Sequence, residues 1–170
     1  MRTIRTTGQG RSRAVADAIE GVFVGELLAP STALWLVSPW LSDIAVIDNG
    51  DGRFAALSRL PRSHIALVDA LGMISASGCS VTVVARQDPT NANVLAKIRG
   101  QVDSGRPIRL VIDPNVHDKA MLTGRLLLSG SMNFTYGGTE RNTESLSIVD
   151  DASQVGAAHL HFGGLYGAQE

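Results

Sequence analysis

The sequence is poor in the features that mark disulfide-rich, membrane-spanning or strongly basic proteins. Its one cysteine, Cys79, excludes an internal disulfide framework and is typical of a reducing compartment such as the cytoplasm. No apolar run reaches the roughly 18 residues that a transmembrane helix needs, and no apolar signal core follows the basic N-terminal residues. The formal net charge is −1, so overall charge does not indicate a nucleic-acid partner. We therefore expect a cytoplasmic protein without a membrane partner.

The 170 residues suffice for one globular domain with a sizeable core, since 44% of them are hydrophobic and only 18% are charged. Apolar residues spaced three and four apart predict helices at 12–28, 65–75, 91–99 and 153–162. Short apolar runs predict strands at 33–37, 81–85, 108–112 and 145–149. Strands that alternate with helices imply an α/β fold in which helices flank a mixed β-sheet.

Reactive side chains gather within the 28 residues from His117 to Glu144. His117 and Lys119 are two apart, and so are Ser131 and Asn133, so each pair shares a face if its segment is a strand. The apolar residues 120–128 between the pairs predict a β-hairpin that turns at 123–124, where glycine would supply a positive φ. This register sets His117 roughly opposite residues 130–131, so the polar side chains converge at the open end of the hairpin.

The segment 117–149 resembles the HKD motif of the phospholipase D superfamily, whose pattern is His-x-Lys, four residues, Asp, six residues and Gly-Ser-x-Asn. It looks most like the short bacterial nuclease branch, in which Gly-Ser-x-Asn-Phe-Thr is followed by Asn-x-Glu; here these are residues 130–135 and 142–144. Each pattern alone is common in exposed strand ends and loops, so the interpretation depends on their order and spacing. The motif's Asp is missing, with Gly124 near its place, and the hairpin is one residue short. We interpret the loss as a trimmed turn, because that Asp has a structural role in the family.

The resemblance implies a single phospholipase D-like domain over residues 1–170 that breaks phosphodiesters without a metal or other cofactor. His117 would attack phosphorus to give a phosphohistidine, and a second His117 would protonate the leaving oxygen. Lys119 and Asn133 would stabilise charge on the non-bridging oxygens, with Ser131 beside them. Glu144 would accept a hydrogen bond from a His117 imidazole.

The motif occurs only once in the chain, whereas this mechanism uses two histidines. A two-fold dimer would present both copies, and this symmetry is the commonest among homo-oligomers. We therefore expect a homodimer with one composite site on its axis. A heteromeric partner with the second copy and an inactive half-site are the alternatives.

Two residues outside the motif follow predicted strands at the end where α/β proteins place ligands. Trp40 could stack on a nucleobase, with a core or interface position as the alternative. Arg86 could contact a phosphate or form an ordinary surface ion pair. The four arginines at positions 2, 5, 11 and 13 form either a DNA-contacting arm or a solvated segment. His159 and His161 are two apart in a helical segment and so predict no metal site.

Residues 34–44 and 46–49 are similar to a phospholipase D-like protein encoded in bacterial clusters that put 7-deazaguanine derivatives into DNA and restrict unmodified DNA. This resemblance implies DNA as the substrate and other proteins of a DNA modification and restriction system as partners. Two other functions remain open. A lipid phosphodiesterase needs a membrane-facing segment, and we find none that is convincing. A non-catalytic assembly module would keep the site as a clamp for phosphate or DNA.

Overall fold

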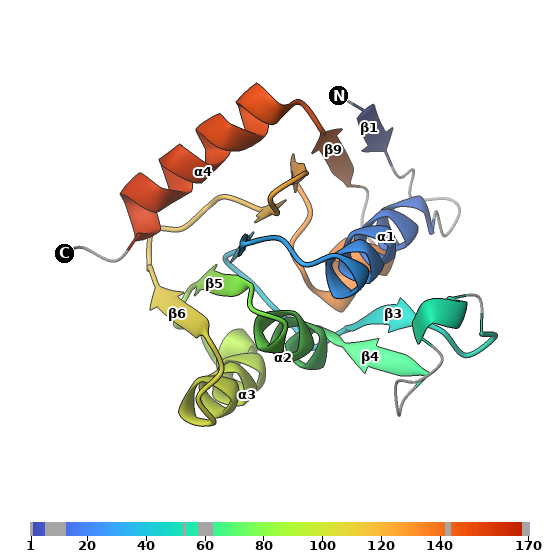
Figure 1. Ribbon diagram of the computed structural model, residues 1–170. Helices are drawn as coiled ribbons and strands as arrows, with labels where there is room; N and C mark the ends of the chain where they lie inside the picture. Colours follow the sequence, from blue (N-terminus) through green and yellow to red (C-terminus); the bar gives the residue numbers. More distant parts are fainter. Residues whose placement is uncertain (1, 6–12, 53, 58–62, 142–143, 168–170) are drawn as a thin grey trace.

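Seven strands form one mixed β-sheet in the computed structural model of the chain, which describes residues 2–5, 13–52, 54–57, 63–141 and 144–167 (Figure 1). One half of the sheet is parallel, and the other half is antiparallel. The strand order is β1 (Arg2–Arg5), β9 (Ser145–Val149), β8 (Leu127–Gly130), β7 (Ala120–Leu122), β2 (Ala33–Val37), β5 (Ser80–Ala85) and β6 (Ile108–Ile112). Strands β2, β5 and β6 run parallel, and β7 joins β2 in the antiparallel direction.

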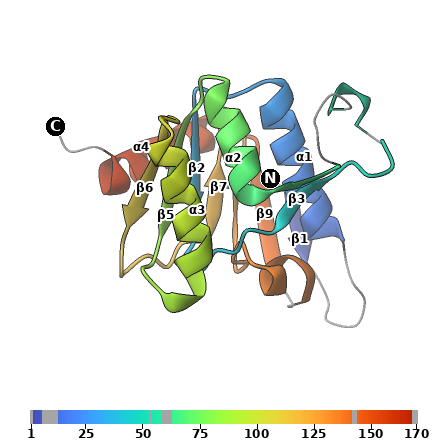
Figure 2. The ribbon, with the colours of Figure 1, turned by 90° about the horizontal axis from the view of Figure 1, so that it is seen from below.

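Helices cover both faces of the sheet. The helices α1 (Ala14–Leu28), α2 (Leu67–Ala76) and α3 (Ala92–Asp103) pack on one face, and α4 (Ala152–Tyr166) lies on the other (Figure 2). Strand β2 serves both layers by alternation, because Leu34 and Leu36 are buried in the three-helix core while Trp35 and Val37 face the α4 side. The predicted α/β class with a flanked mixed sheet is confirmed. Within the described residues, no helix is both long and apolar enough to cross a bilayer.

A small second sheet lies between β2 and α2, where the sequence predicted no strands. It pairs β3 (Ala45–Asp48) with β4 (His64–Ala66) in the antiparallel direction. The helix predicted from residue 65 therefore begins at Leu67, because Ile65 pairs with Ile47. Asp43 caps the new start, since its Oδ1 accepts a hydrogen bond from the backbone N–H of Val68 at 2.9 Å.

The N-terminal residues also differ from the prediction. Arg2–Arg5 form the edge strand β1 and pair with β9, with Arg2 opposite Ile148. The expected arm or solvated segment is therefore sheet at these positions, because the backbone of β9 offers an open edge that apolar periodicity does not reveal. Arg11 lies outside the described residues.

Several chain segments converge at one end of the sheet, where the parallel strands finish. The parallel strands β2, β5 and β6 end there, and the residues that follow them are Ser38, Arg86 and Asp113. Because β7 and β9 run antiparallel to their neighbours, both begin at this end, and β8 ends there at Gly130. Residues that flank six of the seven strands, β2 and β5 to β9, therefore lie at the same end of the sheet. This end, where the parallel strands finish, is where α/β folds hold ligands.

Candidate active site

The hairpin that carries the motif has a longer turn than predicted. Strand β7 pairs with β8 so that Ala120 lies opposite Ser129, and a four-residue loop, 123–126, joins them. The register therefore moves by two residues, and Lys119, not His117, faces Gly130, whose N–H donates to the Lys119 carbonyl at 3.2 Å. His117 and Lys119 precede β7, and Ser131 and Asn133 follow β8, so neither pair lies in a strand as the face-sharing argument assumed. Both pairs still lie at the open end of the hairpin, and His117 and Lys119 line one pocket.

The prediction that Gly124 supplies a positive φ is wrong. Among described residues a positive φ occurs only at Gly52, Gly78 and Gly105. The loop is closed instead by buried Thr123, whose Oγ1 accepts from the N–H groups of Arg125 and Leu126 at 3.2 and 3.1 Å. A Cβ on Gly124 would lie 3.0 Å from the Ser31 hydroxyl, so close approach explains the glycine.

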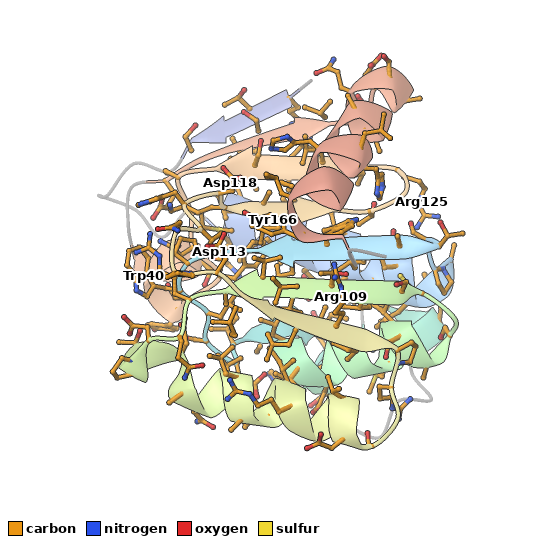
Figure 3. The ribbon with its side chains drawn as sticks, turned by 90° about the vertical axis from the view of Figure 1, so that its left-hand side faces the viewer. Trp40, Arg109, Asp113, Asp118, Arg125 and Tyr166 are labelled. Carbon is orange, nitrogen blue, oxygen red and sulfur yellow. The ribbon has the colours of Figure 1, made fainter. Side chains whose placement is uncertain are left out.

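An ion pair also anchors this turn, at the opposite end of the sheet from the motif. Arg125 donates to the buried carboxylate of Glu26 at 2.7 Å. Ser31 donates to the same carboxylate through its backbone N–H and its hydroxyl. In Figure 3, Arg125 lies at one end of the sheet, whereas Trp40, Asp113 and Asp118 lie towards the other. Thr123 and Arg125 thus hold the turn without the Asp of the motif.

His117 is exposed at the site edge, and its ring contacts a residue outside the motif. Nη2 of Arg86 lies 3.0 Å from His117 Nε2, and Nε of the same guanidinium donates to the Val116 carbonyl at 3.0 Å. Lys119 folds back on its own strand and donates from Nζ to the His117 carbonyl at 2.9 Å. The described site therefore places two cations directly beside the candidate nucleophile.

Ser131 and Glu144 are brought together as neighbours. The Ser131 hydroxyl donates a short hydrogen bond to a Glu144 carboxylate oxygen, and it accepts one from the Ser145 N–H at 3.1 Å. Glu144 is only 8% exposed, so its carboxylate is held in place by the protein. Gly130 permits this packing, because a Cβ there would overlap the Ser145 carbonyl. Asn142 of the predicted Asn-x-Glu pattern lies outside the described residues.

Asn133 is tied to the loop that follows β2. Its Oδ1 accepts a hydrogen bond from the Ser38 hydroxyl at 3.3 Å, and that hydroxyl also lies 2.8 Å from the Trp40 carbonyl. The next residue, Phe134, accepts at its carbonyl from the Ser42 N–H at 2.8 Å and forms a parallel bridge with Leu41. Ser38 is a site residue that the sequence reasoning missed, although the end of a parallel strand marked its segment.

Trp40 and Arg86 contact each other, as two neighbouring strand ends should allow. The guanidinium carbon of Arg86 lies 5.2 Å from the centre of the Trp40 ring, which is a cation–π distance. Both side chains are partly exposed, so Trp40 is not a core residue. The observed contacts of Arg86 are with His117, Val116 and Trp40. They do not correspond to the alternative of an ordinary surface ion pair.

A buried asparagine joins the two loops that carry these residues. Asn91 is 0% exposed. Its Oδ1 accepts from the Leu41 N–H at 2.9 Å, and its Nδ2 donates to the carbonyls of Pro39 and Arg86 at 2.8 and 2.9 Å. Asn91 directly precedes α3 and follows a turn in which Asp88 accepts from the Thr90 N–H and hydroxyl. These bonds lower the pKa of Asp88. Nothing in the local sequence distinguishes Asn91 from a helix-starting residue.

A pocket of about 310 Å³ lies between the hairpin and α4. Its lining includes His117, Lys119 and Gly130 on the hairpin side and Ala158, His161 and Phe162 on α4. Burial, with the nearby carboxylates of Asp118 and Asp113, raises the pKa of Tyr166 at the end of this helix. Within the described part of the chain no three His, Cys, Asp or Glu side chains cluster as a metal site would require.

Comparison with known proteins identifies the family and the fold. A family model described as "Cardiolipin synthase, PLD-like domain" matches residues 54–165. No match to a curated protein is found by sequence. Among solved structures, Nuc from Salmonella typhimurium, a phospholipase D family member, has a TM-score of 0.59 at 14% identity, covering 96% of this chain and 93% of its own.

Two other structures share the fold at similarly low identity. Polyphosphate kinase from Porphyromonas gingivalis has a TM-score of 0.66 at 16% identity over 99% of this chain and 24% of its own. TrmBL2, an archaeal chromatin protein whose structure shows a mode of DNA binding, has a TM-score of 0.56 at 12% identity, over 98% of this chain and 52% of its own. These likenesses show the fold alone. The family model, by contrast, covers more than half of the sequence and includes the whole His117–Glu144 segment, so the chain belongs to the phospholipase D-like family.

Proposed function

We propose that this protein is a metal-independent phosphodiesterase that cleaves DNA at a composite homodimer site, and that residues 1–170 form one phospholipase D-like domain. One observation carries the proposal. Exposed His117 lies at the ligand-binding edge of the sheet with Arg86, Lys119 and the Asn133 amide, and the Ser131–Glu144 pair is held at the same edge. A nucleophile with two fixed cations beside it suits an anionic phosphodiester.

The chemistry needs two proton-handling groups of opposite state. A ring nitrogen of His117 forms a bond to phosphorus while the bond from phosphorus to the leaving oxygen breaks, and a second, protonated His117 gives that oxygen its proton. Water then attacks phosphorus, the second histidine takes a proton from this water, and the phosphorus–nitrogen bond breaks. Both histidines return to their starting states, so the cycle uses only water.

The remaining residues act on charge and orientation. Lys119 and Asn133 bind the non-bridging oxygens, where negative charge builds in the transition state, and Ser131 supports them through Glu144. Glu144 is proposed to orient the imidazole of His117 from the partner subunit. Trp40 and Arg86 are proposed to contact the nucleic acid beside the scissile phosphate.

A second copy of the chain is proposed to bring the second histidine. The pocket between the hairpin and α4 is lined by His117, and α4 also exposes two large apolar side chains, Leu160 at 81% and Leu165 at 56%. An exposed apolar helix next to a half-complete site suits an isologous interface, in which each subunit offers the same patch.

Mixing wild-type protein with His117→Ala tests the dimer. If each site uses two His117 residues, an equal amount of the variant should lower wild-type activity to about half once subunits exchange at random. Unchanged activity after confirmed exchange would contradict the composite site and would favour a second histidine within the chain. His161 lines the same pocket, so His161→Gln is the variant to examine next.

DNA as the substrate is supported by the resemblance of the motif to the bacterial nuclease branch, and by the fold shared with a DNA-binding chromatin protein. The experiment is cleavage of single- and double-stranded DNA in excess EDTA by wild type, His117→Ala and, as a matched control, His64→Ala. His64 is exposed in β4, away from the motif. We expect cleavage by wild type and His64→Ala, and at least a roughly thousandfold loss in His117→Ala.

A non-catalytic clamp is the second candidate, because the hydrogen bond from Arg86 occupies a ring nitrogen of His117. Binding of DNA without cleavage by the wild type would favour it. Other proteins of a DNA modification and restriction system are proposed as partners; cleavage that differs between DNA with and without 7-deazaguanine derivatives would support that setting.

A further inference from the structure

Arg86 reaches the candidate nucleophile from outside the motif and is held there by contacts on several sides. Its guanidinium lies 3.0 Å from His117 Nε2 and 3.0 Å from the Val116 carbonyl oxygen, and it stacks 5.2 Å from the centre of the Trp40 ring. Its own carbonyl accepts from buried Asn91. A long side chain fixed in this way has a defined position relative to the histidine ring.

The contact between Arg86 and His117 determines where the ring proton lies. A guanidinium only donates hydrogen bonds and keeps its charge at any pH at which proteins are folded. His117 Nε2 must therefore be the acceptor, so this nitrogen carries no proton. In the free site the ring beside Arg86 is then neutral and protonated on Nδ1, and the copy of His117 that protonates the leaving oxygen takes up its proton only after Arg86 has left Nε2. Nε2 is consequently the nitrogen whose lone pair is available for attack on phosphorus.

The same contact covers that lone pair in the free site. Before Nε2 can bond to phosphorus, Arg86 has to leave it. A phosphodiester offers anionic oxygens, which form stronger hydrogen bonds with a guanidinium than a neutral imidazole does. Lys119 is in a comparable position, since its Nζ also rests on a neutral acceptor, the His117 carbonyl. An incoming phosphate thus offers both cations a better partner.

We propose that Arg86 is the positioning residue of the nucleophile: it holds His117 as the Nδ1-protonated tautomer with Nε2 covered, and it passes to a phosphate oxygen when an anionic diester binds. This inference rests on the proposed function and assigns a control step to the same site. Only hydrogen bonds change in the transfer. Departure of Arg86 also uncovers the ring face of Trp40, which then becomes available to a neighbouring base.

The direct test reads the tautomer of His117 by nuclear magnetic resonance of its ring nitrogens in the full-length protein. Wild type at a pH where the ring is neutral should show the proton on Nδ1. In Arg86→Gln the proton should move towards Nε2, whereas Arg109→Gln should leave it unchanged. Arg109 is the matched control, because its guanidinium also lies over a tryptophan, 6.0 Å from the Trp35 ring. A wild-type ring protonated on Nε2 would overturn the proposal without any variant.

Chemical modification gives a second readout that does not need catalysis. Diethyl pyrocarbonate acylates neutral imidazole at an accessible lone pair, and peptide mass spectrometry can follow His117 separately from His64. A charge-assisted bond from Arg86 should slow acylation of His117 by at least about tenfold relative to Arg86→Gln, with His64 as the internal reference. Equal rates at His117 in both proteins would contradict the covering role.

Titration with inorganic phosphate completes the design. Phosphate should shift the His117 ring signals of wild type, and Arg86→Gln should need a higher phosphate concentration, with Arg86→Lys between the two because it keeps the charge but not the planar fork. Phosphate binding that is equally tight without Arg86 would refute the transfer. If Arg86→Gln changes the tautomer of His117 but the wild type cuts no DNA, the proposed function fails and this inference stands. If the wild type cuts DNA but Arg86→Gln leaves the tautomer unchanged, this inference fails and the proposed function stands.

Discussion

Asn91→Asp should destabilise the protein in a pH-dependent way. The new carboxyl group has the shape of the amide, and one oxygen can still accept from the Leu41 N–H. Its other oxygen would face the carbonyl oxygens of Pro39 and Arg86, now 2.8 and 2.9 Å from the amide nitrogen. Two donated bonds are lost, and the position is 0% exposed, so water cannot replace them.

The magnitude follows from these three contacts. Each lost hydrogen bond costs about 1 kcal/mol, and a buried carbonyl left without a donor costs about 1–3 kcal/mol more. The Pro39 carbonyl keeps a long contact with the Arg86 N–H at 3.4 Å, so only the Arg86 carbonyl bears the full penalty. We therefore expect a loss of about 3–5 kcal/mol in the free energy of unfolding near neutral pH.

The sign of the pH dependence follows from the raised pKa of a buried carboxyl group. The unfolded chain releases this proton near pH 3.9, whereas the folded variant holds it to higher pH. Stability of the variant relative to wild type should therefore fall as the pH rises from about 4.5 to 7.5. Below that range the protonated acid can donate to one of the carbonyls, and the deficit shrinks.

Urea unfolding followed by circular dichroism at both pH values measures this difference. Asn93→Asp is the matched control, because Asn93 is exposed in the first turn of α3. A negative charge at this position should leave the stability unchanged or raise it slightly. A deficit below about 1 kcal/mol at neutral pH, or one that is equal at both pH values, would refute the role given to Asn91.

Three further predictions concern other parts of the fold. Gly130→Ala should prevent correct folding around the site, because its Cβ would overlap the Ser145 carbonyl. Gly21→Ala, on the open side of α1, should instead stabilise the protein by about 0.5–1 kcal/mol. Thermal unfolding of both variants and the wild type measures the difference. Thr123→Val should cost about 1–3 kcal/mol in urea unfolding, because two loop N–H groups lose their acceptor, and an unchanged midpoint would contradict the role given to this hydroxyl. Burial raises the pKa of Cys79 from 9.0 to about 11, so a thiol reagent at pH 8 should label Cys79 only on unfolding. The free energy of unfolding should fall as the pH rises from 9 to 11, because in this range only the unfolded chain has lost the thiol proton.

Apolar patterns predicted the large elements well, because their residues face a core. The runs 33–37 and 108–112 match β2 and β6 residue for residue. Short strands with few buried residues were missed, since β1, β3 and β4 exist through pairing with distant backbone and not through their own periodicity. The turn at Gly124 was wrong for a similar reason: the glycine responds to Ser31, which is 93 residues away in the chain.

The site was predictable to the extent that it is local in sequence. His117 and Lys119 come just before β7, and Ser131 and Asn133 come just after β8, so spacing alone predicted that both pairs lie at the open end of one hairpin, whatever its register. Ser38 and Asn91 were not foreseen, because each acts by binding backbone or amide groups brought in by the fold. Arg86 was suspected from its strand end, but its contact with His117 depends on how two loops pack.

The seam between the parallel and antiparallel halves of the sheet separates the residues that contact each other in the site. Strands β2 and β7 meet through three residue pairs, Trp35 with Leu122, Leu36 with Met121 and Val37 with Ala120. Arg86 and Trp40 belong to the parallel half, whereas His117 and Glu144 belong to the antiparallel half. The position of Arg86 relative to His117 therefore depends on these six buried or half-buried residues, in addition to the hydrogen bond from Arg86 to the Val116 carbonyl.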